Sequence, residues 1–315
     1  MTKENKDYGK SIKAKLLNLS KAERLPYQPL LIRYVQERLL YRLAQSKYKH
    51  RFYLKGGALL YAHEQFKARP TLDIDFLGNS IANDKKIIEE AFSEICGISC
   101  EKDGIRFDTD TIETEEINEN RVYKGIRLHV IARLDTARQK ITMDIGFGDV
   151  ITPNPQELEY PLLLDDLPPV NIMAYSLETV VAEKFQAMIE LSENNSRMKD
   201  FYDLYTLLYD KTIDDVLLEK AIHATLKNRE TVYEENHPLF SDDFSTNPRF
   251  QMLWKGFMKK IGKTEPDFET VIHLIAETLP VPTIFTLPAF TFKELTVTPS
   301  LTTSVFGAVP ASTVP

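Results

Sequence analysis

The sequence predicts a mixed α/β domain followed by a helical domain. In the first half of the chain, short segments that alternate apolar and polar residues, as strands do, lie between segments with helical spacing. Prolines then interrupt residues 152–170, and helical spacing dominates from Ser176 onward. We therefore expect an α/β domain over residues 1–150, a connector over 151–170 and a helical domain over 171–282. Residues 283–315 form a tail of low charge that we expect to be mobile or strand-prone.

Apolar periodicity predicts the individual elements in chain order. Before the connector, the expected helices are Lys10–Ser20, Leu30–Ser46 and Asn83–Ile95, and the expected strands are Phe52–Leu54, Leu72–Leu77, Ile105–Phe107, Thr109–Glu113, Gly125–Ile131 and Ile141–Phe147. After the connector, the expected helices are Ser176–Leu191, Ile213–Ile222, Phe250–Ile261 and Phe268–Thr278.

The composition is that of an ordinary globular protein. The chain has 315 residues, of which 43% are hydrophobic and 27% charged, so it can bury a substantial core. It contains no run of about 18 apolar residues, and residues 1–10 lack the apolar core of a signal peptide. Cys96 and Cys100 have no further Cys or His nearby in sequence that would complete a zinc site. We expect a cytoplasmic protein with reduced thiols and no membrane partner.

Positive charge is concentrated at the start of the chain. Residues 1–55 carry 14 Lys/Arg and 4 Asp/Glu, whereas the remainder carries 25 basic and 42 acidic residues. Local charge matters more than net charge to a polyanionic partner. We therefore predict that Arg33, Arg38 and Arg42 form an RNA-docking face on one helix. A solvated face, or a surface for a partner protein, explains the same pattern.

A glycine pair followed by two alternating acids is the central motif. Gly56 and Gly57 free the backbone N–H groups to approach a phosphate ahead of a helix. In the strand that follows, Asp73 and Asp75 share a face at roughly 7 Å spacing, close enough to bind one divalent cation together. A phosphate cradle beside paired carboxylates equips a protein for nucleotidyl transfer. A plain turn followed by a solvated edge strand is the alternative.

One further acid and one lysine stand out among apolar neighbours. In the strand Ile141–Phe147, Asp144 points away from the apolar face, and a lone buried carboxylate is costly unless it is paired or coordinating. If this strand lies beside Leu72–Leu77, Asp144 becomes a third metal ligand; otherwise it is an ordinary acid at a strand end. Lys184 lies on an apolar helical stripe, so it either snorkels to solvent or points into a cleft.

These segments resemble the AbiEii/AbiGii-type toxin nucleotidyltransferases, which belong to the DNA polymerase β-like nucleotidyltransferase superfamily and are related to the MenT toxins. The resemblance covers about Lys10 to Pro282. It rests on Lys55-Gly56-Gly57, Arg69-Pro70-Thr71-Leu72-Asp73-Ile74-Asp75-Phe76, the Asp144–Asp149 block, Ala182-Glu183-Lys184 and the Arg197–Asp203 block. It implies a polymerase β-like nucleotidyltransferase domain with a mixed sheet, followed by a helical domain.

The resemblance also implies a role for each motif residue. The nucleotide-binding residues would be Lys55, Gly56, Gly57, Arg69 and Lys184, the metal ligands Asp73, Asp75 and Asp144, and the catalytic residues Asp73, Asp75, Lys184 and Asp200. Asp200 has an alternative role as a carboxylate that stabilises a helix N-terminus. Arg69 either contacts phosphate or pairs with Asp75, and Asp149 is expected to cap or turn the chain.

The function implied by the resemblance is that of a toxin in a toxin–antitoxin or phage-defence system. Such a toxin would use Mg²⁺ to transfer NMP from an NTP to RNA, with tRNA as the acceptor and pyrophosphate as the product. A cognate antitoxin, or the regulator of its operon, would be its protein partner. Two alternatives stay open: transfer to a protein or small molecule, or a non-catalytic NTP-binding module.

Overall fold

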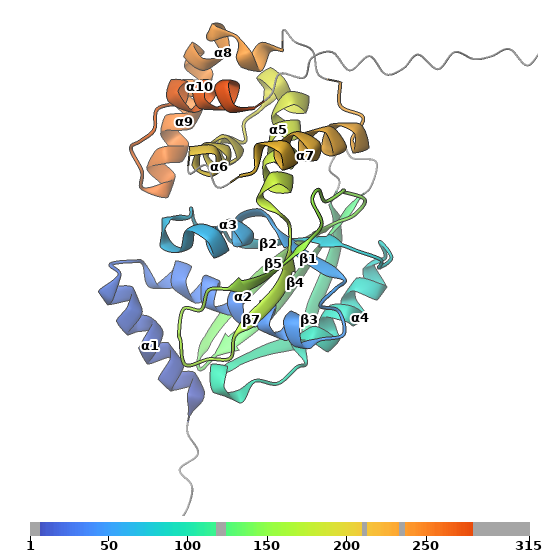
Figure 1. Cartoon of the computed structure of the whole chain (residues 1–315). Coiled ribbons are helices and arrows are strands. Elements are labelled where there is room, and N and C mark those ends of the chain that lie inside the picture. The colour runs from blue at the N-terminus through green and yellow to red at the C-terminus, as the bar shows by residue number, and fades with distance from the viewer. Residues whose placement is uncertain (1–6, 118–123, 210–212, 233–236, 280–315) are drawn as a thin grey trace, which may run out of the picture.

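The computed structural model describes residues 7–117, 124–209, 213–232 and 237–279, and Figure 1 shows their two-part arrangement. A sheet with its helices forms the lower part, and a group of helices forms the upper part. The expected tail over residues 283–315 lies outside the described residues. Each helix of the described residues is too short or too polar to cross a bilayer.

In the described part of the chain, seven strands form one mixed sheet in the order β3-β4-β5-β2-β1-β7-β6. β2 pairs parallel to β5 and β1 parallel to β7, while the other neighbours pair antiparallel. The mixed sheet expected from the sequence is thereby confirmed. Its strands are β1 (Phe52–Lys55), β2 (Asp73–Gly78), β3 (Ile105–Ile117), β4 (Gly125–Leu134), β5 (Ala137–Gly146), β6 (Gln156–Tyr160) and β7 (Val170–Ala174).

The last two strands lie where we expected a connector and the start of the helical domain. β7 alternates buried Val170, Ile172 and Ala174 with less buried residues, so it adds a regular strand beside β1. β6 lies at the sheet edge, where flanking prolines do not interrupt the pairing of neighbours. The sheet therefore extends beyond residue 150, because proline content alone does not distinguish an edge strand from a connector.

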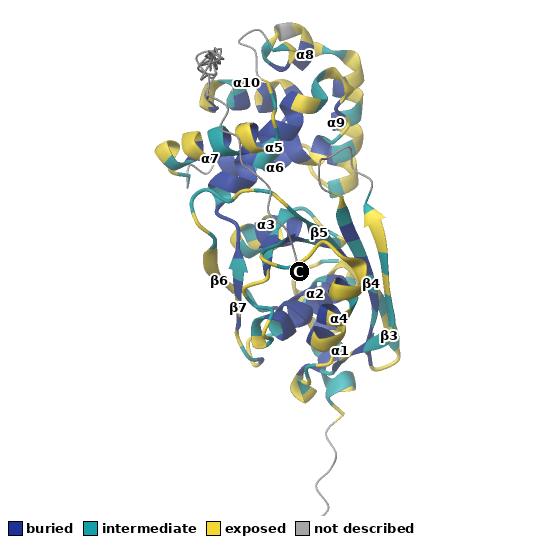
Figure 2. Cartoon of the chain, turned by 90° about the vertical axis from the view of Figure 1, so that its right-hand side faces the viewer, coloured by how far each residue is buried: buried dark blue, intermediate teal, exposed yellow. Residues whose placement is uncertain are grey.

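Helices of the first half cover one face of the sheet and leave the other open. α2 packs on β5 and β7, α4 packs on β3, and α1 packs on α2 (Figures 1 and 2). On β4, Leu128 and Val130 face these helices and are buried, whereas Arg127 and His129 alternate onto the open face. These helices are α1 (Tyr8–Ala22), α2 (Tyr27–Gln45), α3 (Gly56–Glu64) and α4 (Lys85–Cys96).

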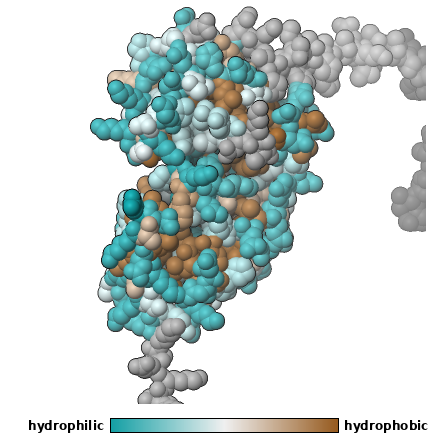
Figure 3. Space-filling view, turned by 60° about the vertical axis from the view of Figure 1, so that its left-hand side comes forward, coloured by the Kyte–Doolittle hydropathy of each residue, from teal (hydrophilic) through white to brown (hydrophobic). Residues whose placement is uncertain are grey.

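The upper part is helical, as the sequence predicted. Ser176 caps the first of its helices by accepting a hydrogen bond from the N–H of Thr179. An aromatic cluster that includes Phe201, Phe250 and Phe268 forms the core of this part. Its helices are α5 (Leu177–Leu191), α6 (Met198–Tyr209), α7 (Asp215–Asn228), α8 (Asp242–Thr246), α9 (Pro248–Ile261) and α10 (Phe268–Thr278). Apolar residues at the surface gather mainly on the lower part in the view of Figure 3.

The expected RNA-docking face on α2 is wrong. Arg38 and Arg42 are 0% and 1% exposed, because α1, α4 and the sheet enclose this helix. Arg42 donates to Asp103 Oδ2 at 2.7 Å, and Arg38 lies 2.8 Å from Glu37. The Arg33 guanidinium lies 3.6 Å from the centre of the Tyr61 ring. Arg38 and Arg42 are therefore part of the buried packing of α2, whereas Arg33 is half-buried against Tyr61.

Replacing Arg42 should test this structural role. Arg42→Met leaves Asp103 buried without its cation, so we expect a loss of about 3–5 kcal/mol in the free energy of unfolding, measured in urea. Adding Asp103→Asn should recover much of the loss, because asparagine keeps an acceptor for the N–H of Ile105 without a charge. If Arg42→Met were as stable as the wild type, the ion pair would not stabilise the fold.

Candidate active site

A cleft opens where the sheet meets the helical part of the chain. The ends of β1, β2 and β5 form one wall, and α5, α6 and residues near the end of α7 form the other. Most of the residues that the sequence singled out line it: Lys55, Gly56, Gly57, Arg69, Asp75, Asp144, Lys184 and Asp200. The structure thus brings together motifs that are as far apart as 145 positions in the printed sequence.

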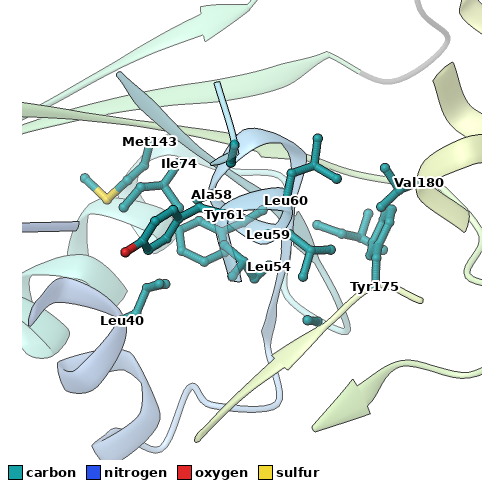
Figure 4. Packing of buried hydrophobic residues seen from close by; sticks show 14 of the residues in the cluster. Leu40, Leu54, Ala58, Leu59, Leu60, Tyr61, Ile74, Met143, Tyr175 and Val180 are labelled. Carbon is teal, nitrogen blue, oxygen red and sulfur yellow. The ribbon is translucent and has the colours of Figure 1, made fainter. Parts of the chain in front are cut away.

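The Gly56 turn lies directly against a carboxylate. Gly56 has φ +64°, and a Cβ built there would stand 1.9 Å from Asp75 Oδ2. A Cβ on Gly57 would stand 2.8 Å from Thr71 Oγ1. Only glycine permits this backbone conformation and this approach without displacing its neighbours. The pair therefore lets the first turn of α3 begin beside the acids of β2, and Figure 4 shows the apolar residues of α3 packed behind it.

Asp73 and Asp75 are carboxylates without partners among the described residues. They share one face of β2, and neither side chain makes a hydrogen bond or ion pair with any described residue. Burial raises the pKa values of both Asp73 and Asp75, and the charge of nearby Asp144 raises both further. Exposed Lys199 on α6 lowers both pKa values through space without contact. A cation bound between the two acids would relieve this unfavourable burial.

Asp144 lies beside Asp75, as the sequence suggested. β2 and β5 pair parallel with Asp75 opposite Asp144. Both oxygens of Asp144 accept hydrogen bonds from Arg127, from Nε and Nη2, at 2.8 Å each. Within the described part of the chain, no cluster of three or more His, Cys, Asp or Glu side chains forms a metal site. The role of Asp144 as a third ligand stays a prediction, and it requires Arg127 to release the carboxylate.

Lys184 points into the cleft and does not snorkel to solvent. Its Nζ lies 2.8 Å from Asp200 Oδ1 and 2.6 Å from Asp203 Oδ2. Burial by itself would lower the pKa of Lys184, but the two carboxylates outweigh it and raise that pKa. Arg69 donates to both oxygens of Asp203, at 2.7 and 2.8 Å. Arg69 therefore pairs with Asp203 and not with Asp75, and its contact with a phosphate stays a prediction.

A second network surrounds Lys55, and sequence reasoning missed most of it. Lys55 Nζ lies 3.0 Å from Asp149 and 3.1 Å from Glu183. Arg229, just past α7, lies 2.8 Å from Asp149 and 3.3 Å from Glu183. Burial alone would raise the pKa of Asp149, but Lys55 and Arg229 hold that pKa well below its usual range. Its expected role in capping or turning the chain stays a prediction. No sequence motif contains Arg229, so no local pattern indicated it. Glu183, in contrast, lies in the motif Ala182-Glu183-Lys184 and could have been predicted from it.

Comparison with known protein families identifies the family to which this chain belongs. The sequence model of the nucleotidyl transferase AbiEii toxin, of a type IV toxin–antitoxin system, matches residues 38–274. This chain belongs to the AbiEii toxin family. The resemblance noted from the motifs is confirmed, and the chain is a nucleotidyltransferase of a toxin–antitoxin system. None of the curated proteins matches it.

Solved structures similar to this AbiEii chain are distant in sequence. JHP933 from Helicobacter pylori is 15% identical with a TM-score of 0.45, covering 81% of this chain and 91% of its own. A putative nucleotidyltransferase from H. pylori is 15% identical with a TM-score of 0.42, covering 80% and 96%. An antigenic nucleotidyltransferase-like protein from Paracoccidioides brasiliensis is 13% identical with a TM-score of 0.35, covering 76% and 92%.

Two glycine substitutions separate backbone strain from damage to the site. Gly262 also has positive φ, at +71°, but a Cβ there meets nothing within 4 Å. Gly262→Ala should therefore lower the free energy of unfolding only by the backbone strain, about 1–2 kcal/mol, and leave nucleotide binding unchanged. Gly56→Ala should cost more and abolish binding, because its Cβ displaces Asp75. Urea unfolding and calorimetric titration with non-hydrolysable NTP analogues measure both; equal behaviour of the two variants would contradict the close approach.

Lys184→Met tests whether the lysine holds its two acids. The substitution suits an apolar helical stripe, so a snorkelling lysine would tolerate it. Because Asp200 and Asp203 would lose a shared buried cation, we expect a loss of about 3–5 kcal/mol in unfolding free energy. Lys199→Met on the neighbouring helix replaces an exposed lysine and should stay within about 0.5 kcal/mol of the wild type. Equal stability of the two variants would remove the ion-pair role.

Proposed function

We propose that this AbiEii chain transfers NMP from an NTP to a hydroxyl of RNA and releases pyrophosphate. tRNA is the acceptor that the motif resemblance implies. The observation that carries the proposal is that the Asp73 and Asp75 carboxylates have no hydrogen bond or ion pair with the residues that the structure describes. Lys55, Arg69, Arg127 and Lys184 around them are already held by carboxylates, which leaves these two acids open to a ligand.

The two acids fit a divalent cation. They supply the oxygen ligands that Mg²⁺ prefers, and burial disfavours their charges as long as no cation is near. Magnesium usually binds one or two carboxylates and completes its shell with water and substrate phosphates. Mg²⁺ bound there would neutralise phosphate charge and make the attacking hydroxyl a better nucleophile. Asp73 and Asp75 are thus sufficient as protein ligands, with or without Asp144.

Residues of both walls would bind the triphosphate. The N-terminus of α3, freed by Gly56 and Gly57, presents backbone N–H groups that favour an anion. Lys55 and Lys184 stay protonated, because neighbouring acids raise their pKa values despite burial, which acts in the opposite direction. A triphosphate would compete with Asp200 and Asp203 for Lys184, as it would with Asp144 for Arg127.

Asp200 is better suited to orienting than to accepting a proton. Burial raises its pKa, but Lys184 and Arg197 outweigh burial and leave the pKa below its usual value. An acid with a lowered pKa is a weak general base. We assign to Asp200 the positioning of Lys184, which it contacts directly.

The biological setting follows from the family. Membership of a type IV toxin–antitoxin family implies an antitoxin partner and a nucleotide substrate. We propose a cytoplasmic site of action and a role in phage defence. We also propose a nucleotidyltransferase domain that ends with the sheet and a helical domain that closes the cleft from the other side.

The acceptor is tested by following a labelled nucleotide. Wild-type protein is incubated with each α-labelled NTP, total RNA and Mg²⁺, and the label is then located in RNA, protein or small molecules. RNA labelling that requires Mg²⁺ supports the proposal. Label on protein or on a small molecule favours one alternative, and absence of transfer favours a non-catalytic NTP-binding module.

Asp73→Asn and Asp75→Asn should abolish transfer and leave the fold intact. Each removes a metal ligand worth several kcal/mol of transition-state stabilisation, so the rate should fall about a hundredfold or more. Because burial already disfavours these charges, the melting temperature should hold or rise. Asp243→Asn, at an exposed site on α8, is the matched control and should transfer normally. Wild-type activity in Asp75→Asn would refute the assignment.

A further inference from the structure

The open face of the sheet carries a row of three arginines at its far end. Strand register places Arg106 of β3 opposite Arg133 of β4, and Arg133 opposite Arg138 of β5. Like charges directly opposite one another destabilise a sheet. Asp108 pairs with Arg106 and Arg133, whereas Arg138 makes no hydrogen bond or ion pair with any described residue.

Lys140 enlarges this row. It lies two residues from Arg138 on β5, so both side chains point to the same open face. Both are exposed, and the Lys140 side chain also lacks a partner among the residues that the structure describes. We call the group formed by Arg106, Arg133, Arg138, Lys140 and Asp108 the arginine row. Asp108 neutralises only part of this charge, and the positive charge that remains on exposed Arg138 and Lys140 favours an anionic ligand.

The arginine row is continuous with the candidate active site. Along β5, positions 138, 140, 142 and 144 alternate onto one face and lead from the row to Asp144. Thr142 lies opposite Asp73, and Asp144 lies opposite Asp75. Six strand residues span roughly 20 Å. A chain of phosphates bound at the row could therefore extend along β5 to the two acids.

We infer that the arginine row binds the sugar–phosphate backbone of the RNA acceptor while its reacting hydroxyl lies at Asp73 and Asp75. The inference rests on the proposed function, since it takes RNA as the acceptor. A phosphate backbone offers repeated negative charges at the spacing of a strand surface, which single metabolites lack. Acids on the same face, Glu113 and Glu115, lie on edge strand β3, so the backbone follows the β5 side.

The double variant Arg138→Glu/Lys140→Glu tests the inference. Glutamate at position 138 would face Arg133 and form a favourable cross-strand pair, so the fold should tolerate the change. The matched control is Lys255→Glu/Lys259→Glu, which reverses two exposed lysines on α9. Filter binding of total tRNA at several salt concentrations, KM for tRNA, kcat, and titration with a non-hydrolysable NTP are compared for the three proteins.

The test has distinct outcomes. We expect the KM for tRNA to rise about tenfold or more in the row variant, with kcat and NTP binding unchanged. The slope of log binding constant against log salt concentration should become less steep by roughly 1.4–1.8, which corresponds to the loss of two phosphate contacts. The α9 variant should behave as the wild type. If the wild type labels RNA and the row variant keeps its KM and slope, this inference alone is overturned. If the wild type labels no RNA, the proposed function fails and the inference with it.

Discussion

The approach of the Gly56 turn to the Asp75 carboxylate is the contact on which the rest of the site depends. A side chain at position 56 would overlap Asp75 Oδ2, so the approach requires glycine. It brings the N-terminus of α3 beside the acids of β2, and packing of α3 on Leu54 and Ile74 holds it there (Figure 4). Groups suited to phosphate and groups suited to metal therefore share one wall because of backbone sterics.

Paired charges shape the opposite wall and join the two parts of the chain. Arg69, just before β2, binds Asp203 of α6, and Arg229, just after α7, binds Asp149 beyond β5. In a buried setting, such pairs hold each side chain in place, because an unpaired charge there is costly. The same pairs keep Lys55 and Lys184 charged and pointing into the cleft.

The arginines of this chain show that residue type alone does not tell an exposed charge from a buried, structural one. Arg38 and Arg42 looked like a docking face, yet they are enclosed around α2 and paired with acids. No sequence pattern predicted a role for Arg138, yet its side chain is exposed and lies opposite Arg133. Burial and strand register separate the two cases, and both depend on contacts between segments distant in sequence.

The sequence by itself determined the alternation of helices and strands up to Phe147, the glycine turn and the shared face of Asp73 and Asp75, because these follow from local periodicity. It also indicated the family, whose motifs are short and contiguous. Only the tertiary structure decided that β6 and β7 complete the sheet, that Asp144 is bound by Arg127, and that Arg229 belongs to the cleft. Partners in strand pairing and ion pairing come from remote segments, so no local pattern encodes which residue meets which.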